Sequence, residues 1–99
     1  MEKSMHIEFE VASEKMSEAK TIIQTFISNI RAHEPGTRMY TSLQDAARPT
    51  RFVHVMIFQD EEAQLQHRNS AYVKEFTQKL YPICVVTPVF TEMNHILSK

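Results

Sequence analysis

The sequence predicts an α+β fold with the ferredoxin-like order β-α-β-β-α-β, in which helices cover one face of a four-stranded antiparallel sheet. Three observations support this fold class. Residues 13–33 carry one long apolar stripe at helical spacing, three segments alternate as strands do, and a second helical region follows the third strand. The chain has 99 residues, so we expect a single domain spanning residues 1–99.

The first strand is predicted over residues 4–11, because apolar side chains alternate there with polar ones. Ser13 is a reasonable N-terminal cap for the helix that follows. The helix buries one face, whose residues recur at steps of three and four. They are Met16, Ala19, Ile22, Ile23, Phe26, Ile27 and Ile30.

The long helix is predicted to stop at Glu34-Pro35-Gly36, because proline cannot continue it and glycine allows a positive φ. Residues 37–44 form the second predicted strand. Residues 45–50, which include Pro49, then make a hairpin connection to the third strand over 51–59.

The third strand is apolar on both faces. Phe52, His54, Met56 and Phe58 face one way, and Val53, Val55 and Ile57 face the other. A strand of this kind needs cover on both sides. Helices of the same chain cover one side, and a second copy in a two-fold symmetric dimer would cover the other.

The second helical region is predicted as two helices, the first capped by Asp60 and the second by Ser70. The second helix ends before Pro82. Residues 83–86 are then expected to connect to a last strand over residues 89–96.

Composition excludes several classes of function. Net charge is −1 with no long run of either sign, which argues against nucleic-acid binding and against a polybasic membrane surface. No signal peptide or membrane span is recognisable, so a cytoplasmic location is expected. A single glycine excludes phosphate-binding loops, and Cys84, the only cysteine, is expected to be a buried apolar residue.

Several pieces of the sequence match one family in order and spacing. They are Glu34-Pro35-Gly36-Thr37, then Tyr40, Asp45, Pro49 and Phe52, then Ala63, His67, Ser70, Tyr72, Val73 and Phe76. Together they resemble the antibiotic biosynthesis monooxygenase family. The resemblance implies a dimeric α+β barrel, a homodimer whose sheets face each other, with a pocket between sheet and helices in each subunit.

The resemblance also implies a range of activities. Relatives include cofactor-free monooxygenases that act on quinols and aromatic polyketides, whereas others degrade haem or process small signalling molecules. Many relatives carry a glutamate on the third strand where this chain has Met56. The haem-degrading relatives place a histidine ligand where this chain reads Lys74-Glu75-Phe76-Thr77, so haem degradation is not expected.

Three residues are candidates for catalysis. His67 could accept a phenolic proton, with a surface histidine at a helix end as the alternative. His54 is the second candidate base, and a core histidine bonded to a neighbouring strand or across a dimer is the alternative. Asn69 could orient a carbonyl or a peroxide through its amide, or it simply ends a helix.

Candidate substrate contacts are aromatic. Tyr72 and Tyr40 could each offer a phenol to a ligand, and Phe9, Phe58, Phe76 and Phe90 could wall an aromatic pocket, although all of these side chains also suit plain packing. His6, His33 and His95 have no metal-ligand spacing, so neither a metal nor a cofactor is expected.

The expected function is oxidation of a small quinol, aromatic or enolic substrate by O2 without a cofactor. A deprotonated, electron-rich substrate reacts with oxygen itself, and the protein supplies a dry pocket, a base and a donor for the developing oxyanion. Two alternatives stay open. One is a non-catalytic domain that binds a small ligand or only dimerises, and the other is isomerase-like processing of a small oxygenated metabolite.

Overall fold

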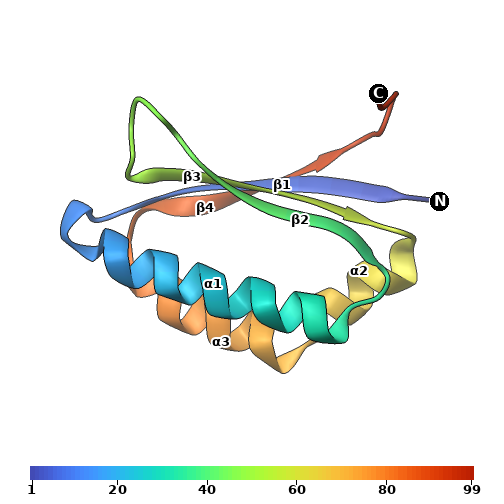
Figure 1. The fold of residues 1–99 in the computed structure, drawn as a ribbon, viewed down its shortest axis with the longest axis horizontal. Coiled ribbons are helices and arrows are strands. Elements are labelled where there is room, and N and C mark those ends of the chain that lie inside the picture. The colour runs from blue at the N-terminus through green and yellow to red at the C-terminus, as the bar shows by residue number, and fades with distance from the viewer.

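The computed structural model describes residues 1–99 and contains one sheet covered by helices on one side (Figure 1). The strands are β1 (Lys3–Val11), β2 (Thr37–Gln44), β3 (Arg51–Phe58) and β4 (Cys84–Met93). The α-helices are α1 (Met16–His33), α2 (Glu61–Arg68) and α3 (Ala71–Leu80), and two short 3-10 turns, η1 (Ser13–Lys15) and η2 (Tyr81–Ile83), precede α1 and β4.

The four strands lie in the order β2-β3-β1-β4, and every neighbouring pair is antiparallel. This arrangement confirms the predicted α+β, ferredoxin-like fold with the second helical region divided in two. The most apolar strand, β3, therefore lies inside the sheet between β2 and β1, where both of its edges are hydrogen-bonded.

The predicted stripe of α1 faces the sheet. Ala19, Ile23, Phe26 and Ile30 are buried, and Phe26 stacks on Phe76 of α3 with ring centroids 4.0 Å apart. Burying a large apolar side chain of this kind stabilises the fold by about 1.5–3 kcal/mol. These contacts fix α1 and α3 side by side against the sheet, as Figure 1 shows.

The helices cover one face of the sheet only. On β3, Phe52, His54, Met56 and Phe58 are all buried under the helices, whereas Val53, Val55 and Ile57 on the opposite face are only partly buried. The strand pattern predicted the two sets, and the packing decides which set is covered. The second face is left open in the single chain.

The N-terminal cap predicted at Ser13 is wrong. Ser13 lies in η1, which precedes α1, and its hydroxyl donates a hydrogen bond to Glu14 and not to a backbone N–H of the helix. The two other predicted caps are confirmed, because Asp60 accepts from the backbone N–H of Ala63 and Ser70 accepts from that of Val73.

The reason given for Gly36 is also wrong. No glycine of the chain has a positive φ. A Cβ atom at Gly36 would instead lie 2.7 Å from the Cβ atom of Ala63. Glycine is therefore required here because the chain after α1 passes too close to α2 for any side chain. This close approach places the end of α1 against α2.

The last strand was misplaced, because β4 begins at Cys84 and ends at Met93 and does not span residues 89–96. The register against β1 shifts between Glu8 and Glu10, opposite the segment that contains Pro88. A proline is tolerated at such an irregularity on an edge strand, where its missing N–H costs no ladder bond.

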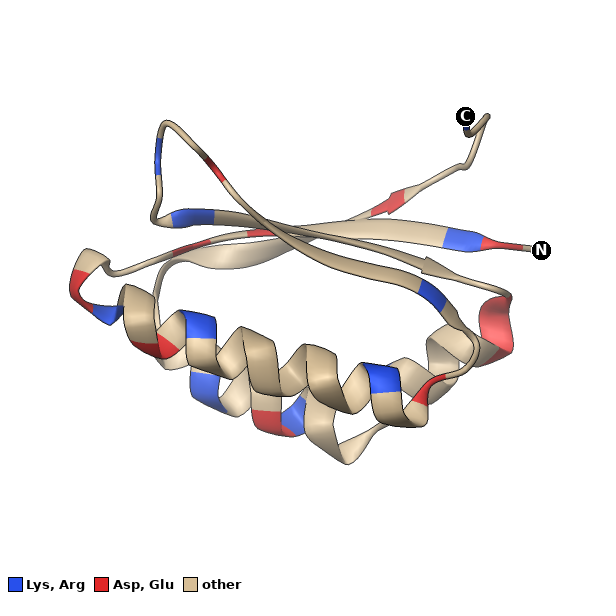
Figure 2. Ribbon diagram, in the orientation of Figure 1, with Lys and Arg blue, Asp and Glu red and all other residues tan.

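Glu34 is the only lysine, arginine, aspartate or glutamate that is buried. Figure 2 shows lysine, arginine, aspartate and glutamate along α1 and α3, in the hairpin between β2 and β3, and near the strand ends. The longest helix, α1, has 18 residues, and no helix combines this length with the hydropathy that a membrane span requires.

Candidate active site

A cavity of about 360 Å³ lies between the sheet and the helices. This volume falls within the usual range of small-molecule sites, about 300–1,000 Å³. Its lining comes from all four strands and all three α-helices. The apolar lining residues are Met5, Ile7, Phe9, Phe26, Tyr40, Met56, Phe58, Val73, Phe76, Leu80, Pro88 and Phe90, and Tyr81 adds a further aromatic ring.

His67 is the one imidazole in the cavity wall. It occupies the last turn of α2 and is only 9 % exposed, so it is not the surface histidine that the alternative reading described. Its Nδ1 atom lies 2.9 Å from Oε1 and 3.0 Å from Oε2 of Glu34. A buried imidazole and a buried carboxylate thus form a pair at the edge of an apolar cavity.

Glu34 is the residue after the last turn of α1, and it is 5 % exposed. Thr37 donates a hydrogen bond to its Oε1 atom at 2.7 Å, and the Tyr72 hydroxyl donates to its Oε2 atom. Burial raises the pKa of Glu34, but the hydrogen bonds from His67, Tyr72 and Thr37 together outweigh burial and hold the pKa below its usual range. The carboxylate is therefore ionised at neutral pH.

This ionised carboxylate fixes the tautomer of His67. A carboxylate can only accept hydrogen bonds, so Nδ1 of His67 carries a hydrogen and donates it to Glu34. Nε2 of His67 has no hydrogen-bond partner in the protein. Every side-chain nitrogen or oxygen that is buried does have a partner, so Nε2 is not buried but accessible. In the neutral ring Nε2 carries a lone pair, and His67 lines the cavity wall.

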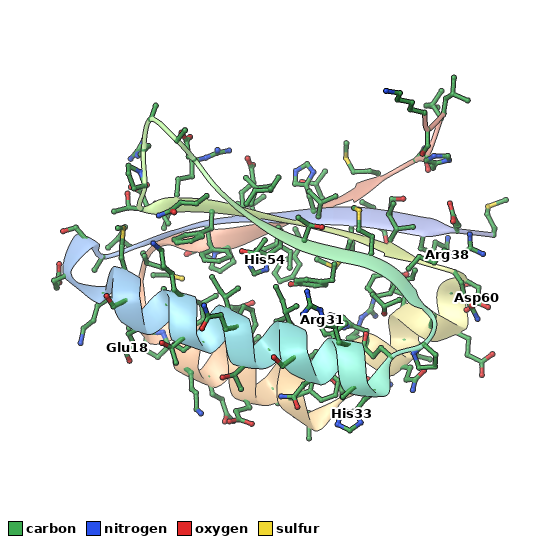
Figure 3. The ribbon with its side chains drawn as sticks, in the orientation of Figure 1. Glu18, Arg31, His33, Arg38, His54 and Asp60 are labelled. Atoms are coloured by element: carbon green, nitrogen blue, oxygen red, sulfur yellow. The ribbon has the colours of Figure 1, made fainter.

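His54 lies between the sheet and the helices (Figure 3), and it is not among the residues that line the cavity. It is fully buried, with Nδ1 2.7 Å from the Tyr40 hydroxyl and Nε2 2.9 Å from that of Ser42. Burial lowers the pKa of His54 to about 4. Both nitrogens are thus occupied by groups of the neighbouring strand β2, which corresponds to the core-histidine reading.

Two other candidates lie outside the cavity lining. Asn69 is exposed and ends α2, where its backbone N–H bonds to Leu65 and His67. Tyr72 turns its hydroxyl to Glu34 and lines a shallow groove between α1 and α3. Burial, followed by the bond to Glu34, raises the pKa of Tyr72 to about 12. Tyr72 therefore supports the carboxylate and does not face the cavity.

The remaining candidates do line the cavity: Tyr40, Phe9, Phe58 and Phe76, together with Phe90. So does Met56, the position at which the family resemblance implied a glutamate in many relatives. The third strand thus brings no carboxylate to the cavity, and Glu34 approaches His67 from the end of α1.

Glu34 and Thr37 were missed as site residues, because Glu34-Pro35-Gly36-Thr37 was interpreted as a helix end and as part of the family resemblance, without a role at the site. One signal was available. Glu34 is an acidic residue at the C-terminal end of α1, where the helix dipole disfavours negative charge, so a compensating partner was to be expected.

Four polar side chains also line the cavity: Gln64, Arg68, Thr77 and Glu92. Gln64 is buried, whereas Arg68 and Glu92 are exposed, carry opposite charge and also border a second, polar depression that contains Glu61 and Glu62. The lining of the cavity is therefore mostly apolar, with one basic and one acidic side chain on its exposed side. No three histidine, cysteine, aspartate or glutamate side chains are grouped as metal ligands.

Comparisons with known proteins agree with this architecture. The structure superposes on a protein of Caulobacter crescentus named as a candidate antibiotic biosynthesis monooxygenase, with a TM-score of 0.91, 16 % identity, and coverage of 97 % of this chain and 91 % of that one. A Nitrosomonas europaea protein described in the same words gives a TM-score of 0.89 at 17 % identity, covering 96 % and 90 %. A conserved protein of Methanosarcina mazei gives 0.87 at 19 %, covering 94 % and 91 %.

At these identities the solved structures show a shared fold. No curated protein sequence matches the chain. The family model for antibiotic biosynthesis monooxygenases matches residues 4–79, which include the first three strands, the long helix and the pair His67 and Glu34. This protein therefore belongs to the antibiotic biosynthesis monooxygenase family.

Proposed function

We propose that this protein is a cofactor-independent monooxygenase that oxidises a small quinol, aromatic or enolic substrate with O2. One observation carries the proposal: the buried Glu34–His67 pair leaves one imidazole nitrogen accessible in the wall of an apolar cavity. A base that is oriented by a carboxylate and shielded from bulk water suits deprotonation of a phenol or enol.

In the first step Nε2 of His67 takes the proton of the substrate hydroxyl. The resulting imidazolium is stabilised by the Glu34 carboxylate, which already accepts a hydrogen bond from Nδ1. The substrate is left as an electron-rich anion among aromatic side chains, with Phe9, Phe58 and Phe76 in the cavity wall.

In the second step the anion transfers one electron to O2, and the substrate radical and superoxide combine to form a carbon–oxygen bond. The peroxide anion then takes the proton from His67. Loss of the hydrogen on that carbon, with cleavage of the O–O bond, gives a carbonyl group and one molecule of water. One oxygen atom of O2 enters the product and the other leaves as water, so no external reductant is needed.

The cavity suits this chemistry because its lining is mostly apolar with a few polar groups. The rings of a one- or two-ring aromatic substrate would pack against the phenylalanines, and its oxygen substituents would contact the few polar groups of the wall. The low polarity of the interior also strengthens the charge–charge contact between imidazolium and carboxylate.

A homodimer is part of the same proposal. The open sheet face has an apolar centre of Val53, Val55 and Ile57, with Leu43 and Val89 52 % and 53 % exposed beside it. The strand β1 adds polar groups to this face: Glu8, paired with Arg51, lies between Val53 and Val89, and Glu10 is paired with Arg48. Interfaces between protein copies commonly combine apolar area with polar and charged groups.

The test is oxygen uptake by the purified protein with 1,4-naphthohydroquinone and related quinols, with the rate corrected for uncatalysed oxidation. We expect His67→Asn to reduce the catalysed rate by about 100-fold or more, and 18O2 to place one labelled atom in a product formed from an anthrone. Glu75→Gln, which changes an exposed carboxylate of α3, is the matched control.

Two results would replace this proposal with an alternative. Ligand-induced stabilisation of the fold without oxygen uptake would indicate a binding domain. Substrate conversion with no consumption of oxygen would indicate an isomerase-like reaction. Unchanged uptake in His67→Asn would remove His67 from the mechanism.

A further inference from the structure

The cavity needs a second polar group besides the base, because the substrate oxygen becomes an anion when its proton moves to His67. Neither Asn69 nor Tyr72 can serve as that donor, since neither lines the cavity. Tyr40 does line it, and its ring centroid lies 5.9 Å from that of His67. Tyr40 and His67 therefore face the same part of the cavity.

The Tyr40 hydroxyl is hydrogen-bonded to a buried row of polar groups formed by His54 and Ser42. Its hydroxyl lies 2.7 Å from Nδ1 of His54, and Nε2 of His54 lies 2.9 Å from the hydroxyl of Ser42, its partner across β2 and β3. The His54 ring packs edge-on against Phe9 at 5.1 Å and lies 6.0 Å from Phe76. The two hydrogen bonds and the flanking rings together favour this one orientation of the imidazole.

The protonation states of these groups are limited by burial. His54 is neutral at physiological pH because burial lowers its pKa, so the ring has one N–H group and one lone pair. Burial, followed by the charge of Glu34, raises the pKa of Tyr40 well above its ordinary range, so its hydroxyl keeps its proton. The two hydrogen bonds of the row can therefore both point towards Ser42 or both point towards Tyr40.

In the first direction the Tyr40 hydroxyl donates its hydrogen to Nδ1 of His54, so it has no hydrogen left for a ligand. In the second direction Ser42 donates to Nε2 of His54, and Nδ1–H donates to the Tyr40 oxygen. The hydrogen of the Tyr40 hydroxyl is then free to bond to a ligand. Hydrogen bonds that run in one direction polarise each other, which makes the final donor stronger. Only the second direction lets Tyr40 donate a hydrogen bond to a ligand in the cavity.

We infer that Ser42, His54 and Tyr40 form a directed hydrogen-bond row in which His54 is a positioning residue and Tyr40 donates to the oxyanion of a phenolic or enolic ligand. The inference rests on the proposed function for the identity of the ligand. It assigns His54 to the orientation of a donor in place of the role of a base. In this arrangement the buried polar row orients the Tyr40 hydroxyl as a donor to a ligand in the cavity.

The first experiment needs no variant. Long-range 1H–15N correlation spectra of protein labelled at histidine distinguish a hydrogen on Nδ1 from one on Nε2. We expect His54 to carry it on Nδ1, with Nε2 as the acceptor. A hydrogen on Nε2 in the presence of a bound phenolate would overturn the inference.

The second experiment measures binding of 4-nitrophenol, whose visible absorption distinguishes phenol from phenolate and which requires no turnover. Tyr40→Phe should weaken phenolate binding by about 10- to 100-fold, as expected for loss of a hydrogen bond to a charged group. Binding of nitrobenzene, which has the same ring without a hydroxyl, should change by less than about twofold.

The third experiment separates positioning from mere support of the fold. His54→Asn keeps a side-chain N–H close to the place of Nδ1 and should retain most phenolate affinity, whereas His54→Leu should lose about 3- to 10-fold. Ser42→Ala removes the donor to Nε2 of His54 and should also weaken phenolate binding, whereas Thr41→Val, which removes a hydroxyl from the opposite face of β2, should leave it unchanged. Equal phenolate affinity in His54→Leu and the wild type would overturn the positioning role.

The readouts also separate this inference from the proposed function. If phenolate binding depends on Tyr40 and His54 while no quinol supports oxygen uptake, the donor row stands and the monooxygenase assignment falls. If uptake depends on His67 while phenolate binding is indifferent to Tyr40, the monooxygenase assignment stands and the donor row falls.

Discussion

Nδ1 of His67 lies within 3.0 Å of both carboxylate oxygens of Glu34, although 33 positions separate the two residues in the chain. Glu34 follows the last turn of α1 and His67 lies in the last turn of α2, so the contact joins the ends of two helices beneath the sheet. The pair therefore connects the end of α1 to His67, which lines the wall of the cavity.

Replacement of Glu34 by glutamine should reduce kcat by about 10- to 100-fold, because a neutral amide no longer stabilises the imidazolium that forms when His67 takes a proton. KM should change by less than about threefold, since Glu34 does not line the cavity. Steady-state oxygen uptake checks both values, with Glu75→Gln as the control. A fall in kcat/KM that comes only from a higher KM, with kcat unchanged, would contradict the role given to Glu34.

The buried His54 predicts a distinct dependence of stability on pH. Its folded-state pKa of about 4 lies below its ordinary value of 6.5, so between these values the unfolded chain binds a proton that the folded chain does not. The stabilisation is fully present above about pH 6.5 and is lost as the pH falls to about 4. It corresponds to about 2 kcal/mol between pH 7 and pH 5.

Urea denaturation at pH 7 and pH 5 measures this effect. His54→Leu should remove about 2 kcal/mol of the fall in unfolding free energy between the two values, because leucine has no proton to bind. His33→Leu, at an exposed position of α1, should keep the wild-type dependence and serves as the control. An identical pH dependence in wild type and His54→Leu would contradict the neutral, buried state of His54.

The close approach of Gly36 to Ala63 predicts a steric effect with a specific rescue. Gly36→Ala should destabilise the fold by about 1–3 kcal/mol, since the two Cβ atoms cannot remain 2.7 Å apart. It should also reduce activity, because α2 carries His67 four positions after Ala63. Adding Ala63→Gly should restore activity, at a cost of about 1 kcal/mol in helix propensity.

Thermal and urea denaturation, together with oxygen uptake, compare the single variants with the double variant. Ala63→Gly alone should lose stability without loss of activity. Failure of the double variant to recover activity would show that Gly36 is needed for a reason other than its distance from α2.

The open sheet face predicts that a charge at its centre separates two copies. Val55→Lys should convert a dimer into a monomer, because Val55 lies on the uncovered face of the inner strand β3. Light scattering coupled to size-exclusion chromatography gives the molar mass. Gln24→Lys, which adds the same charge to the exposed side of α1, should leave the mass unchanged. A wild-type chain that is monomeric at micromolar concentration would contradict the dimer.

Periodicity along the chain was sufficient to predict the elements of the fold. Alternation in residues 51–59 defined the two faces of β3, the stripe around Phe26 defined the buried side of α1, and Asp60 and Ser70 marked helix starts. These features depend on neighbours within a few residues, so the sequence alone contains them. The predicted start of the last strand at residue 89 was too late, because β4 begins at Cys84 and includes Pro88, which an irregularity on an edge strand accommodates in a way that no local pattern reveals.

The sequence by itself determined the ferredoxin-like order, the apolar character of both faces of β3 and the presence of His67 near the end of a short helix. Only the tertiary structure decided that Glu34 is the partner of His67, that both ring nitrogens of His54 have partners in Tyr40 and Ser42, and that Asn69 does not line the cavity. The physical reason is that hydrogen bonds between distant segments depend on strand register and on the close approach of α2 to the end of α1. Periodicity specifies which side of an element is buried, but not which residue of another element it meets there.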